Sequence, residues 1–263
     1  MKLKKILTAI AKGIFVLAFW LALWALISLK TGSELLLPSP SSVIRALSGL
    51  AITSDFWITT LFSFLRVFAG IVLSLIIGSV LAVLTESSSI LRALLSPLLG
   101  VIKATPVASF IILALLWISR GTRPLFITTL IVVPIVWSNV CEGIRSVDKD
   151  LIAVTKVYRF SIKDKILKLY VPTIAPFFMA ACKSSLGMAW KAGISAEVLS
   201  TPDNAIGKEL YFSKTYLETP ELFAWTFVVI ILSVVIEKLL VLALTRFGSR
   251  FNFLPRGDRN DNA

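Results

Sequence analysis

The chain has 263 residues, of which 57% are hydrophobic, and its mean hydropathy is +0.88. A soluble domain of this size cannot bury that much apolar surface in one core, so we expect lipid to cover the remainder, which excludes a soluble globular protein. The formal net charge of +12 does not indicate nucleic-acid binding, because the basic residues flank apolar segments and do not alternate with stacking aromatic residues.

The hydropathy pattern predicts an all-α, polytopic membrane protein with about six transmembrane helices, since one span needs about 20 mainly apolar residues. No loop is long enough for a soluble domain, so we expect a single membrane domain over residues 1–263. The first span follows MKLKK, and because no small-residue cleavage site comes after it we expect a retained anchor. In chain order the predicted spans are residues 12–29, 64–84, 94–118, 125–140, 171–194 and 222–244.

Two shorter features lie between and within these spans. Ser39, followed by Pro40, predicts the capped start of a short helix after the first span. In the second span, small residues recur every four positions on one helix face, which indicates a seam for close packing of another helix. The small residues are Gly70, Ser74, Gly78 and Ala82.

The distribution of lysine and arginine predicts the orientation. An even number of spans puts both termini on one side, and if that side is the cytoplasm, sixteen basic residues flank the spans inside and six outside. Seven of the sixteen lie between Arg145 and Lys168. The positive-inside rule therefore predicts a multi-pass protein of the cell membrane with both termini, and the segment 148–170, in the cytoplasm.

The fifth span carries two lysines, each costing about 2.5–3.5 kcal/mol near the centre of a bilayer. Each lysine is therefore expected to face a water-filled path, or to avoid this cost by pairing with a carboxylate or by reaching the interface. One interpretation is a translocation path with a basic wall; the other is an ion pair of Lys183 with Glu142 or Glu197, or snorkelling of Lys191 to the interface. The residues predicted for the path are Lys183, Gly187, Trp190, Lys191 and Glu197.

Nothing in the chain indicates covalent chemistry. It has no histidine, no Gly-x-Ser-x-Gly elbow and no Walker-type phosphate loop. Cys141 and Cys182 lack the spacing of a zinc or redox pair, so both are expected to be small core residues. We expect no catalytic residue, no metal site and no cofactor in this chain.

The segment 148–170 resembles a docking element. Leu151, Val154, Val157 and Tyr158 share one face of a predicted helix, and an apolar face on a cytoplasmic loop needs a partner or the membrane surface.

Several short motifs, in their order and spacing, make the whole chain similar to one known family. The motifs are Leu37-Pro38-Ser39-Pro40, Arg66-Val67-Phe68-Ala69-Gly70, Thr105-Pro106-Val107-Ala108, Gly143-Ile144-Arg145-Ser146-Val147-Asp148, Tyr170-Val171-Pro172, Leu186-Gly187-Met188-Ala189-Trp190, Ala196-Glu197 and Ile206-Gly207. The chain resembles the permease subunits of bacterial ATP-binding-cassette (ABC) importers for nitrate, sulfonate, taurine and bicarbonate.

The resemblance implies a type I (MetI-like) permease architecture and a set of partners. These are an ABC ATPase, which binds the ATP, an extracellular solute-binding protein, and a second permease copy in a homodimer. It also implies that the chain carries a small anion such as a sulfonate, nitrate or taurine, or a related small solute such as a pyrimidine or vitamin-like compound. The family's coupling loop has Glu-Ala-Ala, three residues and a glycine, where this chain has Ala153-Val154-Thr155 and Arg159. By this resemblance the residues of the ATPase contact are Ala153, Val154, Thr155, Val157, Tyr158 and Arg159.

The alternative is an ion-coupled secondary transporter or channel. That class predicts carboxylates within the spans for proton or sodium coupling, and the predicted spans hold almost none apart from Glu237. A membrane-bound enzyme is less well supported, because no cluster of histidines or carboxylates is present.

Overall fold

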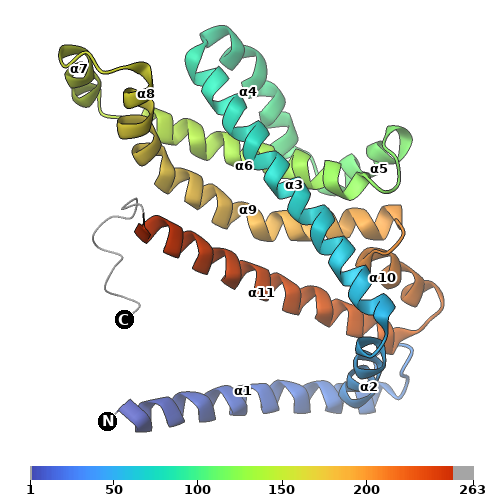
Figure 1. Cartoon of the computed structure of the whole chain (residues 1–263). Coiled ribbons are helices and arrows are strands. Elements are labelled where there is room, and N and C mark those ends of the chain that lie inside the picture. The colour runs from blue at the N-terminus through green and yellow to red at the C-terminus, as the bar shows by residue number, and fades with distance from the viewer. Residues whose placement is uncertain (1, 251–263) are drawn as a thin grey trace.

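The computed structural model describes residues 2–250, with side chains at residues 11–243 and at Arg246 (Figure 1). Every regular element in this range is a helix, as the sequence predicts. Of the basic residues used in the orientation argument, Arg256 and Arg259 lie outside the described residues, and Lys2, Lys4, Lys5 and Arg250 lie outside the described side chains.

Five helices, α1, α3, α6, α9 and α11, are long and apolar enough to cross a membrane. A bent pair, α4 and α5, makes a sixth span if the two count as one, so the expected number of spans is confirmed. The elements are α1 (Lys2–Thr31), α2 (Pro40–Ala51), α3 (Ser54–Ser87), α4 (Ser89–Ala104), α5 (Val107–Trp117), α6 (Arg123–Arg145), α7 (Lys149–Val157), α8 (Ile162–Lys165), a π-helical turn (Ile166–Tyr170), α9 (Val171–Ser200), α10 (Ile206–Thr215) and α11 (Thr219–Arg250).

The predicted span at residues 94–118 is not one continuous helix. This stretch forms α4 and α5, which meet at an angle of 107°. Thr105 is extended, with ψ of 133°, because the ring of the following Pro106 disfavours a helical conformation in the preceding residue. The proline therefore breaks an otherwise continuous apolar segment.

The small residues of α3 form the predicted packing seam. Gly70, Ser74, Gly78 and Ala82 are all buried. A Cβ atom at Gly78 would lie 2.7 Å from Cβ of Val136 on α6, so only glycine permits this approach of the two backbones. Close van der Waals contact along the seam supplies attraction between helices that lipid does not.

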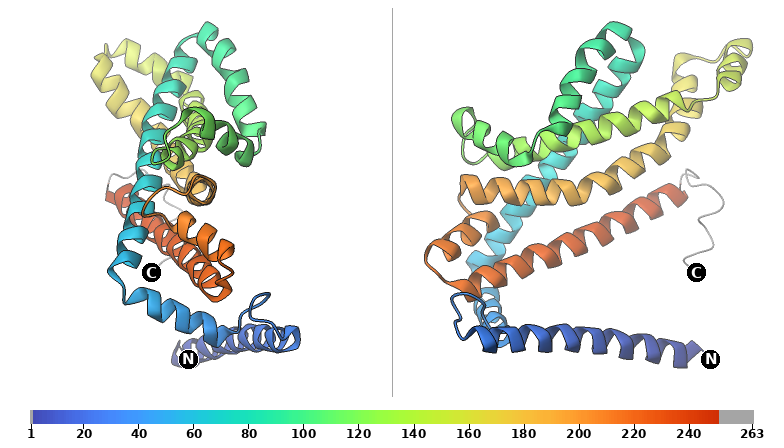
Figure 2. Two further views of the ribbon diagram at one scale, coloured as in Figure 1. Left: turned by 90° about the vertical axis from the view of Figure 1, so that its right-hand side faces the viewer. Right: turned by 180° about the vertical axis from the view of Figure 1, so that it is seen from behind.

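The helices α6 and α9 run side by side, and α3 crosses them (Figures 1 and 2). The core between them contains Val67, Val132 and Ala189, and Cys141 and Cys182 are buried as expected. At one end of the molecule lie α7, the start of α1 and the end of α11, and at the other lie α2 and α10 (Figure 2). We call these the α7 end and the α10 end.

The short helix α2 begins as predicted, with Oγ of Ser39 accepting a hydrogen bond from the amide of Ser42 at 3.2 Å. The α10 end is also where α1 is attached to the body. There the Trp24 ring stacks on Phe223 with 6.1 Å between centroids, and its indole N–H donates to the carbonyl of Pro38 at 3.1 Å.

Candidate functional site

The helix α7 projects from the molecule between α6 and α9, and both of its ends are capped (Figure 1). Its first turn is closed by the carboxylate of Asp148, which accepts from the amide of Asp150 at 2.8 Å. At its last turn the amide of Arg159 donates to the carbonyl of Lys156 at 3.1 Å, and that of Phe160 donates to Thr155 at 2.9 Å. This is a Schellman motif, in which the residue after the helix is left-handed.

Arg159 occupies that left-handed position, with φ of +49°. A residue with a side chain adopts this conformation at a cost of about 1 kcal/mol relative to glycine. The turn is therefore left-handed although arginine stands at the position where the resemblance implies glycine.

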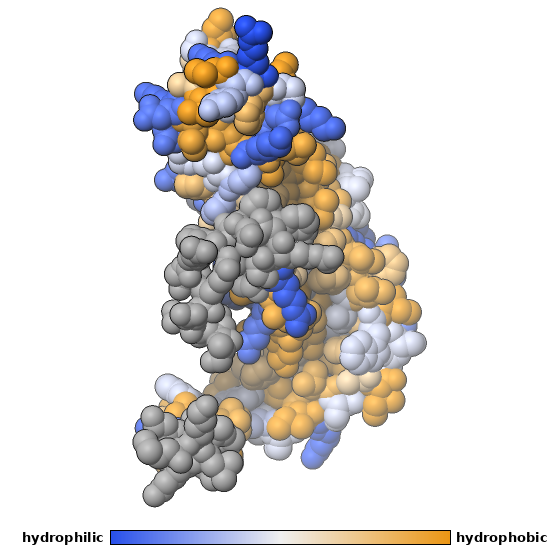
Figure 3. All heavy atoms as spheres, turned by 60° about the vertical axis from the view of Figure 1, so that its left-hand side comes forward, coloured by the Kyte–Doolittle hydropathy of each residue, from blue (hydrophilic) through white to orange (hydrophobic). Residues whose placement is uncertain are grey.

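The apolar side chains of α7 point away from the rest of the chain. Val154, Val157 and Tyr158 are 44%, 78% and 74% exposed. Ala153 is exposed too, whereas Thr155 is buried and donates to the carbonyl of Ile152 at 2.7 Å. Hydrophobic and hydrophilic side chains lie interspersed at this end of the molecule (Figure 3). In the described part of the chain, the predicted docking face is thus open to a partner.

The predicted path residues of α9 fall into two groups. Lys183 and Lys191 are exposed, and Gly187, between them at intervals of four residues, is half-buried. Trp190 is only 3% exposed, and its indole N–H donates to the carbonyl of Val229 on α11 at 3.1 Å. The large ring fills the contact between α9 and α11, so it does not belong to the open face.

Glu197 is buried completely and likewise lies off the open face. It accepts a hydrogen bond from Oγ of Ser63 at 2.8 Å and pairs with the guanidinium of Arg66 at 3.5 Å, both from α3. Its partner is therefore Arg66 and neither of the two lysines of α9. A role in the path remains a prediction for all five residues, of which the structure leaves Lys183, Gly187 and Lys191 accessible.

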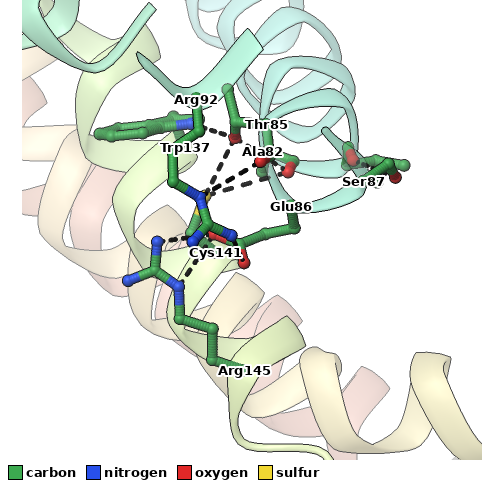
Figure 4. A network of polar contacts seen from close by, with 9 residues as sticks. Ala82, Thr85, Glu86, Ser87, Arg92, Trp137, Cys141 and Arg145 are labelled. Carbon is green, nitrogen blue, oxygen red and sulfur yellow. Dashed lines mark hydrogen bonds and ion pairs between the residues drawn. The ribbon is translucent and has the colours of Figure 1, made fainter. Parts of the chain in front are cut away.

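A second polar cluster, not expected from the sequence, lies where α3, α4 and the end of α6 meet (Figure 4). Glu86 is the centre of this Glu86 cluster. It pairs with Arg92 and, at 2.7 Å, with Arg145. Beside it the indole N–H of Trp137 donates to Oγ1 of Thr85 at 2.9 Å. Because Arg145 ends the helix that leads into α7, the cluster ties the base of α7 to the corner between α3 and α4.

Comparison with known proteins agrees with this geometry. Residues 70–252 match the family described as the binding-protein-dependent transport system inner membrane component. The chain is 26% identical over 216 residues to the aliphatic sulfonates transport permease protein SsuC of Bacillus subtilis, covering 81% of this chain and 78% of that protein. It is 27% identical over 202 residues to the nitrate import permease protein NrtB of Synechococcus elongatus, covering 73% and 72%. It is 28% identical over 209 residues to the bicarbonate transport system permease protein CmpB of Synechocystis, covering 74% and 73%.

Two solved structures share the fold. One is an amino acid ABC transporter with histidines, with a TM-score of 0.54 and 18% identity over 73% of this chain and 90% of that one. The other is the inward-facing MetNI methionine ABC transporter, with a TM-score of 0.52 and 18% identity over 78% and 94%. The MetI-like, all-helical architecture is thereby confirmed. Since the family match extends over most of the chain, this protein belongs to the inner membrane components of binding-protein-dependent transport systems and is a permease subunit of an ABC transporter.

Proposed function

We propose that this chain, as a homodimer, forms the translocation path of an importer for a small anion and couples to a separate ATPase through α7. A solute-binding protein delivers the solute at the α10 end, which faces outward. ATP is bound and hydrolysed by the ATPase subunits. The ATP-driven approach of the two ATPases would press the two α7 helices together and rock the two permeases from inward-facing to outward-facing.

The observation that carries the proposal is the open apolar face of α7. Val157 and Tyr158 are among the most exposed large apolar side chains of the α7 end, on a helix held rigidly by caps at both ends. Each such side chain contributes about 1.5–3 kcal/mol when a partner buries it. A groove on the ATPase that accepts this face explains why the chain keeps it exposed.

Replacing Val157 and Tyr158 together by Asp tests the coupling. Two unpaired charges in the contact would dissociate a transient interface, so the ATPase should no longer co-purify and solute should no longer stimulate ATP hydrolysis in proteoliposomes. The matched control is the double change of Leu36 and Ile52 to Asp, two equally exposed residues near the α10 end, which should retain the ATPase. Retention by the α7 variant as well would place the docking site elsewhere.

The proposed solute class is supported by two observations. Three of the relatives are named as permeases for sulfonates, nitrate or bicarbonate, all of them anions. In this chain Lys183 and Lys191 lie on the exposed face of α9, where positive charge raises the local concentration of an anion.

Replacing Lys183 by Met tests the path. The variant should insert and hold its ATPase, because the change removes an insertion cost of about 3 kcal/mol, but uptake of nitrate, bicarbonate or taurine should fall. Lys103→Met is the control, since Lys103 is an exposed lysine that lies over the Trp137 ring at 5.7 Å and away from α9. Equal uptake by both variants would remove Lys183 from the path.

A further inference from the structure

The first turn of α10 is capped by side chains of two other helices. Ala205, at the cap position, offers no side-chain acceptor, and the first amides of a helix have no partner within it. The amide of Ile206 donates to Oγ of Ser63 on α3 at 2.8 Å, and that of Gly207 donates to the carboxylate of Glu197 on α9 at 3.2 Å. Ser63 itself donates to the same carboxylate, so one buried group joins three helices.

The loop that leads into α10 is held by arginine. The guanidinium of Arg66 donates to the backbone carbonyls of Asp203 at 2.6 Å and Asn204 at 2.8 Å, and it also pairs with Glu197. Asn204 is left-handed, with φ of +48°, which turns the chain so that both carbonyls face the guanidinium. Arg66 thus neutralises the buried carboxylate and fixes the loop with the same planar group.

The helices α9 and α10 are packed so closely that there is no room for a side chain at Gly207. A Cβ atom at Gly207 would lie 2.4 Å from Cβ of Glu197 and 2.4 Å from the backbone nitrogen of Val198. Glu197 cannot turn toward solvent without breaking three contacts and leaving Arg66 unpaired at the edge of the core. Removing one member of this pair would leave the other charge without its partner beside the core, so the arrangement resists local opening.

We propose that Ser63, Arg66 and Glu197 form an outer clamp, which makes α3, α9 and α10 move as one body at the mouth of the solute path. The proposal rests on the proposed function, since the mouth is that of the importer. Glu197 is a positioning residue that does not touch solute. The helix α10 follows directly on α9, which carries the exposed lysines. While the clamp holds α10 to α3 and α9, the outer mouth of the path can open only when all three helices move together.

The attachment of α10 can be tested with the purified permease, without its ATPase or a solute-binding protein. Ala205 is fully buried at the start of α10, and Cys141 and Cys182 are buried as well, so a cysteine at Ala205 should react slowly with a membrane-impermeant maleimide. Adding Glu197→Ala should speed this labelling by at least about tenfold, because the buried pair is lost. Glu197→Gln, which keeps the acceptor for Gly207, should lie between the two.

The control Asp203→Asn removes only the exposed ion pair of this carboxylate with Lys208, while the Asp203 backbone carbonyl still accepts from Arg66. It should label as slowly as the parent. If Glu197→Ala fails to fold, Arg66→Lys replaces it, since lysine keeps the charge but cannot bind both carbonyls with one planar group. Labelling that stays slow in the folded variants would overturn the clamp.

The one-body claim needs transport and is tested with Arg66→Cys and Asn204→Cys in one chain. In the reduced form, solute imported per ATP hydrolysed should fall; bridging the two thiols with a reagent as long as an arginine side chain should restore it. A bridge that blocks uptake instead would show that α10 must separate from α3, which contradicts the proposal. If the unmodified protein imports none of nitrate, bicarbonate and taurine, the proposed function fails at that point, and the labelling experiment still decides on the clamp.

Discussion

Glu86 is the carboxylate on which two guanidinium groups converge, and its side chain is 8% exposed, against 43% for Arg92 and 56% for Arg145. Replacing Glu86 by Gln leaves both arginines without their partner. Since the arginines are partly hydrated, we expect a loss of about 1–2 kcal/mol and not the full cost of a buried pair. Thermal unfolding of the detergent-purified protein measures it. The control is Glu142→Gln, which changes an exposed carboxylate near the end of α6 and should change stability by less than about 0.5 kcal/mol.

Single residues were predictable from the sequence where their own chemistry decided their position. The burial of Cys141 and Cys182 follows from an apolar neighbourhood, and the cap at Ser39 follows from local hydrogen bonding. The pairing of Glu197 with Arg66 was not predictable, because the two are 131 positions apart and only the packing of α3 on α9 brings them together. The periodicity of α9 likewise grouped Trp190 with Lys183, although α11 covers only the tryptophan.

Among the elements, the seam between α3 and α6 is the contact most sensitive to added volume. Replacing Gly78 by Val puts a Cβ atom 2.7 Å from Val136, so the helices must separate or shift. Overpacking of this kind costs about 1–3 kcal/mol, and we expect a lower melting temperature and less monodisperse protein. Gly100→Val on α4 is the matched control, since nothing lies within 4 Å of its Cβ position. Equal melting temperatures of the two variants would show that the contact between α3 and α6 accommodates the valine without loss of stability.

The elements themselves were largely predictable, because the apolar segments are long and separated by charged or turn-forming residues. The bend between α4 and α5 was missed, since an average over a hydropathy window does not register a change of direction. The signal was nevertheless present in Thr105-Pro106, whose ring excludes helical geometry from the residue before it. Helix lengths were also underestimated: α3 begins at Ser54, ten residues before the predicted span.

At the scale of the whole molecule, the excess of basic residues predicts that the α7 end is cytoplasmic. Cysteines at Lys163, beside α7, and at Asp203, before α10, should therefore react with impermeant maleimide from opposite faces of the membrane, with Lys163 reacting only from the cytoplasm. Both native cysteines are buried, so the chain without added cysteines measures the background labelling. Labelling of both positions from one face would overturn the six-span topology. The structure is consistent with the prediction in placing the beginning of α1 and the end of α11 at the same end as α7 (Figure 2).

The outer clamp also has a consequence for how the protein is made. Arg66 enters the bilayer with α3, and Glu197 leaves the ribosome 131 residues later, which at about 5–20 residues per second is an interval of the order of ten seconds. During that time the nascent span holds an arginine without its carboxylate, which favours snorkelling of the guanidinium to the interface. The two side-chain acceptors for the first amides of α10 are brought together only when α9 packs on α3. The polar contacts of the clamp are thus among those that the growing chain can complete only late.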